Sequence, residues 1–125
     1  MSQNNRVKVV IRSRPTVNFA SKNLQIDETS GNINIYIPKD QLQGQVNHQQ
    51  ENWRFRFEKI LQNTSQEVVF ETCAKDIVQS ALEGFSGTCL CYGQTGSGKT
   101  FTMTGSTTDY RYRGLIPRVV HMLYS

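Results

Sequence analysis

The chain has 125 residues, of which 37% are hydrophobic and 10% aromatic, a size and composition typical of one globular domain. It contains neither an apolar run near the roughly 18 residues that span a membrane nor a signal-peptide pattern, so we expect an intracellular, cytoplasmic protein. The net charge of +4 is mild and would suit an acidic partner such as nucleic acid, an anionic membrane or an acidic filament. Because the charges are scattered, we interpret them as a solvated surface and expect no nucleic-acid or membrane partner.

The first part of the chain shows the two-residue periodicity of β-strands. Residues 7–14 are rich in apolar, β-branched side chains, and Pro15 ends the strand that they predict. Residues 24–28 and 33–37 alternate on either side of a Ser-Gly-Asn turn and predict a β-hairpin. Short strands joined by tight turns are therefore expected here.

A polar stretch separates this hairpin from the next strand. Residues 39–52 are rich in Gln and Asn and predict a surface loop with a short strand at its centre. In WRFRF, residues 53–57, aromatic side chains alternate with arginines. This alternation predicts that Trp53, Phe55 and Phe57 face a core while the arginines face outward.

Residues 64–83 change to the periodicity of a helix. Apolar side chains recur there at spacings of three and four, so that one stripe of the helix would be buried. Thr64 and Glu67 form a capping box, in which the hydroxyl and the carboxylate each satisfy a free N–H group. Gly84 is placed to end the helix in the left-handed conformation.

The apolar segment TCLCY, residues 88–92, predicts a strand covered on both faces, as in a parallel sheet. Cys89 and Cys91 would share one face of this strand, although a C-x-C pair is a weak signal for a metal site. Together with Cys73 they make an odd number without a secretory signal, which argues against disulfides. We interpret all three cysteines as core residues.

A glycine-rich stretch follows and fits the pattern G-x-x-x-x-G-K-[ST] of a phosphate-binding loop. It consists of Gly93, Gln94, Thr95, Gly96, Ser97, Gly98, Lys99 and Thr100. The glycines allow backbone N–H groups to point at an anion, together with the N-terminus of the next helix. Lys99 would bridge the β- and γ-phosphates, and Thr100 would offer its hydroxyl oxygen to Mg²⁺. Because an apolar strand enters and helical character resumes at Lys99, we favour a nucleotide site over a flexible glycine turn.

The last residues predict a polar loop and a further helix. Residues 105–114 are mostly polar, and the Arg-Tyr-Arg cluster at 111–113 near Arg118 is interpreted as a solvated face rather than a binding patch. Pro117 would open the last helix at its first position, where a missing N–H group is tolerated.

Four ordered segments resemble the kinesin motor domain, and the resemblance covers essentially the whole chain. YGQTGSGKTFTM, residues 92–103, resembles the phosphate loop of that family and the residues after it. IRSRP at 11–15 resembles the R-x-R-P element of the first strand. FRFEKIL at 55–61 and SQEVVFE at 65–71 resemble F-x-F-D-x-V-F and the helix start that follows it, and RGLIPR at 113–118 resembles G-I-I-P-R.

The resemblance implies an α/β fold of the P-loop NTPase class, with a mostly parallel central sheet and helices on both faces. It also implies ATP and Mg²⁺ as cofactors. Arg12, Arg14 and Pro15 would lie against the adenine, with Phe101 beside the base, since guanidinium groups and aromatic rings offer a base a flat platform. Without the family, the two arginines would be interpreted as solvent-facing charges and Phe101 as a core residue.

The chain departs only mildly from the family pattern. The departures, where the family usually has Asn, Ala, Asp and Phe, are Ser86, Cys91, Glu58 and Leu61. Within the family, residues 46–88 look most like the ninth class, which is associated with cilia and flagella.

The family's two switch patterns, N-x-x-S-S-R and D-L-A-G-S-E, do not occur in the sequence. Because the switches position the attacking water, we expect residues 1–125 to be a partial motor domain, truncated before both switches, with no catalytic residue and negligible ATPase activity. The complete domain would couple ATP hydrolysis to movement along microtubules, whereas this part would bind nucleotide at most. Residues 88–92 would then expose two unpaired strand edges.

Two alternatives remain open. The chain could be a short protein that binds nucleotide or a partner motor without hydrolysis, which saturable ATP binding by the folded chain would favour. It could also be another P-loop enzyme, such as a small-molecule kinase, which phosphate transfer to a small acceptor would reveal. No coiled-coil heptads are present, so the sequence predicts no oligomeric state.

Overall fold

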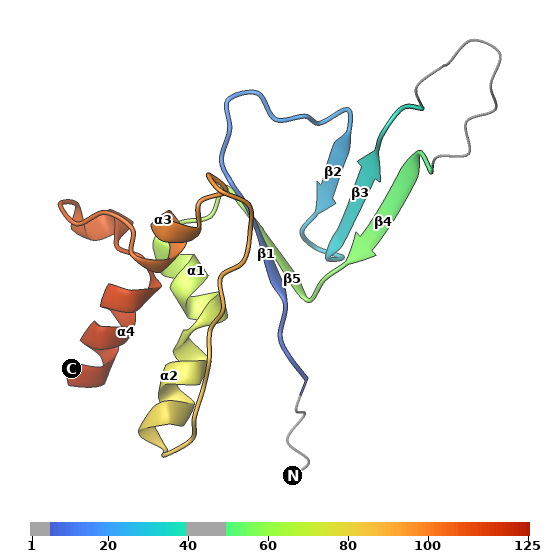
Figure 1. The fold of residues 1–125 in the computed structure, drawn as a ribbon. Coiled ribbons are helices and arrows are strands. Elements are labelled where there is room, and N and C mark those ends of the chain that lie inside the picture. The colour runs from blue at the N-terminus through green and yellow to red at the C-terminus, as the bar shows by residue number, and fades with distance from the viewer. Residues whose placement is uncertain (1–5, 40–49) are drawn as a thin grey trace. The chain divides into compact units, whose positions relative to one another are not determined.

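The computed structural model describes residues 6–39 and 50–125 (Figure 1). The chain divides into two compact units, Met1–Gln62 and Asn63–Ser125, which are described in turn. Strands dominate the first unit and helices the second, and the first contains a parallel strand pair, in agreement with the predicted α/β class. No helix in the described part of the chain is long and apolar enough to cross a membrane.

The first unit contains the parallel pair. β1 (Val10–Ser13) pairs with β5 (Lys59–Gln62), and Ile60 and Leu61 of β5 are among the most buried residues of the chain. The strand predicted over residues 7–14 is therefore confirmed, although it is shorter than predicted. Isoleucine and leucine suit these two positions because their large, branched side chains fill a pleated, buried surface.

The same unit contains a three-stranded antiparallel sheet, in the order β2-β3-β4 (Figure 1). Its strands are β2 (Leu24–Asp27), β3 (Asn32–Tyr36) and β4 (Asn52–Arg56). The pairing of β2 with β3 confirms the predicted hairpin. The central strand predicted within residues 39–52 falls mainly on residues 40–49, which lie outside the described residues.

One carboxylate and one glycine shape the turn between β2 and β3. Asp27 accepts hydrogen bonds from the N–H groups of Thr29 and Ser30 at 3.0 and 3.2 Å and from the Ser30 hydroxyl at 2.6 Å. The bonds from Ser30 lower the pKa of Asp27, because they stabilise its ionised form. Gly31 has φ +73°, and the carbonyl of Phe57 occupies the place where a Cβ would lie.

The aromatic side chains of β4 share one face of the sheet, as the alternation predicted, but they are not buried. The rings of Trp53 and Phe55 stack with 6.5 Å between centroids, and these residues remain 39% and 41% exposed. Phe55 lies opposite Ile33, which is buried. The predicted burial of Trp53 and Phe55 is therefore wrong, because a three-stranded sheet alone leaves much of its apolar face open to solvent.

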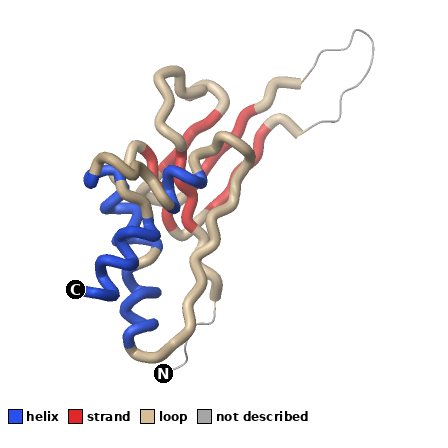
Figure 2. Tube along the Cα trace, turned by 60° about the vertical axis from the view of Figure 1, so that its left-hand side comes forward, coloured by secondary structure: helices blue, strands red, loops and turns tan. Residues whose placement is uncertain are grey.

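The second unit is mainly helical (Figure 2). α1 (Gln66–Cys73) and α2 (Lys75–Leu82) replace the single helix predicted over residues 64–83, because Ala74 leaves helical geometry at φ −123°. The predicted burial of the apolar stripe is confirmed for most of its length but is wrong at its end, where Ala81 and Leu82 are exposed. Its most buried members are Val69, Phe70, Ala74 and Val78.

The start of α1 differs from the predicted capping box. Ser65 is the N-cap residue, and its side chain accepts a hydrogen bond from the N–H group of Val68 at 3.3 Å. The prediction that Thr64 and Glu67 cap the helix is wrong, because the helix begins one residue later than expected. Glu67 still lies in the first turn, where a negative charge is favourable.

The end of α2 matches the prediction at Gly84. This glycine has φ +95°, and its N–H group donates to the carbonyl of Ala81 at 3.0 Å. The next N–H group, from Phe85, donates to the carbonyl of Ser80 at 3.0 Å. These two bonds form a Schellman motif, which satisfies carbonyl groups that the helix end would leave free.

Residues 88–92 do not form the predicted strand. They pair with no strand in the described part of the chain, and Leu90 and Tyr92 are 86% and 95% exposed. A parallel strand needs neighbours on both sides, and the one described parallel pair consists of β1 and β5 alone. Cys89 is exposed as well, so its predicted core position is wrong.

The segment that leads back from α2 runs beside this helix (Figures 1 and 2). Gly87 packs so closely on α2 that an added Cβ would collide with the side chain of Ile77. The segment then reaches α3 (Lys99–Met103), the short helix that the sequence predicted to begin at Lys99. The glycine-rich loop is therefore bounded by this extended segment and by α3.

The last helix begins earlier than Pro117. α4 (Leu115–Tyr124) has Gly114 as its N-cap, so Pro117 is its third residue rather than its first. The first turn still tolerates proline there, because its N–H group would have no intrahelical partner. The polar loop before α4 contains a short 3-10 helix, η1 (Tyr110–Tyr112).

Candidate functional site

The glycine-rich loop owes its shape to three glycines with different roles. Gly96 and Gly98 have φ values of +78° and +101°, which residues with side chains rarely adopt. At Gly93 the limit is space, because the hydroxyl of Ser97 lies 2.5 Å from the place of an added Cβ. The N–H group of Ser97 donates to the carbonyl of Gln94 at 3.1 Å and closes the turn.

Lys99 follows the loop and folds back over it. Its Nζ donates to the carbonyl oxygens of Gly93 and Gln94 at 2.6 and 2.8 Å. These two bonds hold the ammonium group against the loop rather than extended into solvent. A phosphate group entering the loop would therefore meet a positive charge that is already held in place, as a phosphate cradle requires.

Thr100 is the second residue of α3 and is exposed to solvent. Its hydroxyl makes no hydrogen bond within the described residues, so the oxygen is accessible to a ligand. No group of three or more His, Cys, Asp or Glu side chains in the described part of the chain could hold a metal ion. A hydroxyl oxygen is among the ligand types that Mg²⁺ prefers, so the Thr100 side chain is chemically suited to contribute one such ligand.

The first turn of α3 adds backbone donors to the same place. The carbonyl of Gly98 accepts from the N–H group of Thr102 at 3.0 Å, so the helix begins directly after the loop. The N–H groups of the first residues, including Lys99 and Thr100, have no intrahelical carbonyl partner. Backbone N–H groups, the Lys99 ammonium group and the Thr100 hydroxyl thus belong to the loop and to the first turn of α3, and groups of these types suit a nucleotide phosphate with Mg²⁺.

Phe101 lies on α3 and is 45% exposed. Its ring centroid is 6.5 Å from that of Tyr112, and the two ring planes are inclined by 43°. This contact supports one side of the ring, and the exposed part leaves room for a further flat group. Phe101 can therefore pack against Tyr112 and still lie beside a base, so the two roles considered for it do not exclude each other.

The three residues predicted to contact adenine belong to the first unit. Arg12 lies in β1, and Arg14 and Pro15 are exposed residues directly after this strand. The glycine-rich loop and α3 belong to the second unit. The structure brings residues 93–101 together within one unit, while the adenine contacts of Arg12, Arg14 and Pro15 remain a prediction.

Sequence reasoning missed one residue beside this site. Gln66 opens α1, is only 4% exposed, and donates from Nε2 to the carbonyl of Phe101 at 2.6 Å. The same nitrogen donates to the carbonyl of Tyr112 at 3.2 Å. The sequence did carry a signal. Gln66 lies three and four residues before the buried Val69 and Phe70, so helical periodicity places its polar side chain on the buried face.

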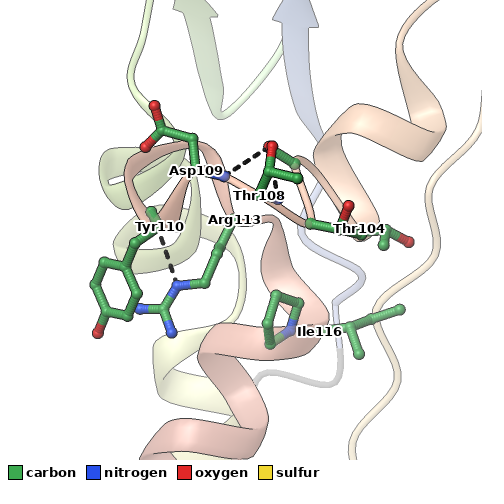
Figure 3. A pocket seen from close by; sticks show the side chains of 9 residues that line it. Thr104, Thr108, Asp109, Tyr110, Arg113 and Ile116 are labelled. Atoms are coloured by element: carbon green, nitrogen blue, oxygen red, sulfur yellow. Dashed lines mark hydrogen bonds between the residues drawn. The ribbon is translucent and has the colours of Figure 1, made fainter.

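The basic cluster belongs to a structured loop after α3 (Figure 3). Arg111 pairs with Asp109 at 2.9 Å, and its hydrogen bonds lower the pKa of Asp109. The guanidinium of Arg113 lies 3.1 Å from the ring centroid of Tyr110. Arg118 donates to the carbonyl groups of both Arg113 and Arg111. These arginines therefore organise their own loop.

The same loop borders an open cavity of about 530 Å³ (Figure 3). It is lined by Thr104, Ser106, Thr107, Thr108, Asp109, Tyr110, Arg113, Ile116 and Pro117. The N–H groups of Thr108 and Asp109 donate to the Ser106 hydroxyl at 3.2 and 3.0 Å. The cavity lies beyond the C-terminal end of α3, whereas the glycine-rich loop lies at its N-terminal end.

Comparison of the sequence with known proteins shows the family to which the chain belongs. Residues 12–125 match the kinesin motor domain. The chain is 44% identical to kinesin-like protein KIF9 of Mus musculus over 124 residues, which is 99% of this chain and 16% of that protein. It is 45% identical to kinesin-like protein KLP1 of Chlamydomonas reinhardtii over 118 residues, 94% of this chain and 15% of that protein. It is 38% identical to the kinesin heavy chain of Strongylocentrotus purpuratus over 122 residues, 95% of this chain and 10% of that protein.

Proposed function

The chain belongs to the kinesin motor domain family, and on that premise we propose that it forms the ATP-binding part of a microtubule motor. The complete domain would couple ATP hydrolysis to movement along microtubules. The observation that carries this proposal is the loop 93–98, with Lys99 held over it and the first turn of α3 directed at it. The match to the family over residues 12–125 supports the same function.

Each residue of the loop has a role in this proposal. Backbone N–H groups of residues 93–98 surround the phosphates, and Lys99 exchanges its two carbonyl partners for phosphate oxygens. Thr100 contributes its hydroxyl oxygen to Mg²⁺, which neutralises phosphate charge when it is bound. From the family resemblance, we propose that Phe101, Arg12, Arg14 and Pro15 contact the adenine base.

We further propose that residues 1–125 are the N-terminal part of such a domain. The chain spans 16% of the length of the mouse relative that it matches, and its sequence contains neither switch pattern. Positioning of the attacking water would belong to residues outside this sequence, and we expect negligible ATPase activity from the 125 residues alone. Their own task would be to bind ATP with Mg²⁺.

We place the protein on the cytoskeleton, with microtubules as its partner, in line with the family. A ciliary or flagellar location is the finer proposal. It rests on the resemblance of residues 46–88 to the ninth kinesin class and on the similarity to KIF9 and KLP1. A protein of kinesin ancestry that binds nucleotide through the same loop without hydrolysing it is the second candidate, supported by the loop and Lys99 alone.

The test of ATP binding is a titration of the 125-residue chain with ATP and Mg²⁺ by calorimetry. We expect saturable binding, and Lys99→Ala should weaken it by about tenfold or more, since hydrogen bonds to charged groups contribute about 1.5–3 kcal/mol. The matched control is Lys75→Ala on α2, which removes an exposed lysine that pairs with Glu71. The proposal fails if the folded wild-type chain does not bind ATP or if both variants bind it equally well.

A further inference from the structure

Gln66 is the one buried polar side chain among the described residues, with 4% of its surface exposed. Its neighbours on the same helix face, Val69 and Phe70, are apolar and also buried. Burying an amide is unfavourable unless its hydrogen bonds are made inside the protein. An amide at this position therefore needs partners, and these partners show what it holds.

Two hydrogen-bond partners of its side chain belong to different segments beyond the glycine-rich loop. Nε2 of Gln66 donates to the carbonyl of Phe101 in α3 at 2.6 Å and to the carbonyl of Tyr112 in η1 at 3.2 Å. The carbonyl of Phe101 lies near the end of α3, where the helix does not supply all its carbonyl groups with donors. Gly105, which could have donated to it, donates to the carbonyl of Thr100 instead.

α3 depends on such contacts because it is very short. It has five residues, too few for a helix that is stable by itself in water. Gly114 adds a second constraint, since the backbone of Thr102 and Met103 lies where its Cβ would be. The position of α3, and of Lys99 and Thr100 at its start, is therefore set by neighbouring segments.

We propose that Gln66 is a positioning residue for nucleotide binding. By holding the carbonyl of Phe101, it fixes α3 against α1 and keeps Lys99 and Thr100 in place for the phosphates and Mg²⁺. It does not touch the nucleotide and acts only through α3. This inference rests on the proposed binding of ATP.

Two substitutions and one control test this role in the 125-residue chain. Gln66→Glu puts a carboxylate oxygen in place of the amide donor, so it faces two carbonyl oxygens. Gln66→Met has similar length without any donor, and it decides the question if the glutamate variant does not fold. Gln79→Glu makes the same change of charge on the exposed surface of α2 and is the matched control.

Two quantities are measured by calorimetry, with circular dichroism to verify folding. The first is the Kd for ATP with Mg²⁺, which we expect to rise about tenfold in both Gln66 variants and to stay unchanged in Gln79→Glu. The second is the gain in ATP affinity from Mg²⁺, which is the Kd measured with a chelator divided by the Kd measured with Mg²⁺. A displaced Thr100 should reduce this gain, whereas a smaller folded fraction would weaken binding equally with and without Mg²⁺.

The outcomes separate this inference from the proposed function. If the wild-type chain binds no ATP, the proposed function fails, and the inference fails with it. If the wild-type chain binds ATP and the folded Gln66 variants match Gln79→Glu in both quantities, the proposed function stands and the positioning role is overturned. A higher Kd with an unchanged gain from Mg²⁺ would likewise overturn the role, because Thr100 would then keep its place without the Gln66 amide.

Discussion

Two glycines show how the same residue type serves two physical needs at the residue scale. Gly84 has φ +95° and open space around its missing side chain, whereas Gly114 has an ordinary φ of −82° and no space. The carbonyl oxygen of Met103 lies 2.5 Å from the place of an added Cβ at Gly114. Gly114→Ala should therefore lower the free energy of unfolding by about 1–3 kcal/mol, measured by urea denaturation.

The control for this prediction is Gly84→Asn. Asparagine tolerates the left-handed conformation and would meet no neighbouring atom, so we expect a change of only a few tenths of a kcal/mol. Equal stability of Gly114→Ala and the wild-type chain would show that α3 and α4 can move apart without cost.

At the scale of one element, the sequence and the structure assign the N-cap of α1 to different residues. Ser65 accepts the hydrogen bond from Val68, whereas the sequence predicted Thr64 in that role. Ser65→Ala should destabilise the chain by about 1 kcal/mol, because the N–H group of Val68 loses its partner at the helix end. Thermal and urea unfolding of the purified variant would measure this loss.

The matched variant is Ser65→Asn, which keeps a side-chain oxygen at the N-cap and should retain most of the stability. If Ser65→Ala were neutral while Thr64→Ala carried the loss expected for a cap, the capping box predicted from the sequence would be correct and Ser65 would not be the cap.

At the scale of the whole molecule, residues 88–92 present apolar side chains to solvent. Leu90 and Tyr92 are 86% and 95% exposed, and no strand of the described chain pairs with this segment. Exposed, unpaired apolar segments promote association between chains. We expect the 125-residue chain to self-associate, and Leu90→Asp should raise the concentration at which light scattering detects oligomers.

Thr88→Asp serves as the control, because it adds the same charge in the same segment without removing apolar surface. We expect it to raise this concentration less than Leu90→Asp does. If both variants had equal effects, net charge rather than the apolar segment would govern association.

Features that depend on neighbouring residues could be predicted well. The hairpin of β2 and β3, the buried stripe at Val69 and Phe70, and the helix end at Gly84 all agree with their sequence patterns. Periodicity and turn residues act within a few positions of the chain, so the sequence carries their signal directly. The same holds for the glycine-rich loop, whose pattern needs glycine at positions 96 and 98 to reach positive φ.

Features that depend on segments far apart could not be predicted in this way. The burial of Trp53 and Phe55 and a strand at residues 88–92 were expected from local patterns and are absent. Each depends on a covering layer or a neighbouring strand that no local pattern specifies. Gln66 was missed for the same reason, since its partners lie 35 and 46 residues away.

The sequence by itself determined the family, the α/β class and the position of the glycine-rich loop, because these are expressed by local order and spacing. Only the tertiary structure decided that Lys99 folds over the loop carbonyls and that Ser65 caps α1. It also decided that Gln66 donates a hydrogen bond to the carbonyl of Phe101, because the partner of a buried amide is fixed only when distant segments have packed together. Hydrogen bonds across long sequence separations are products of packing, and packing exists only in the folded chain.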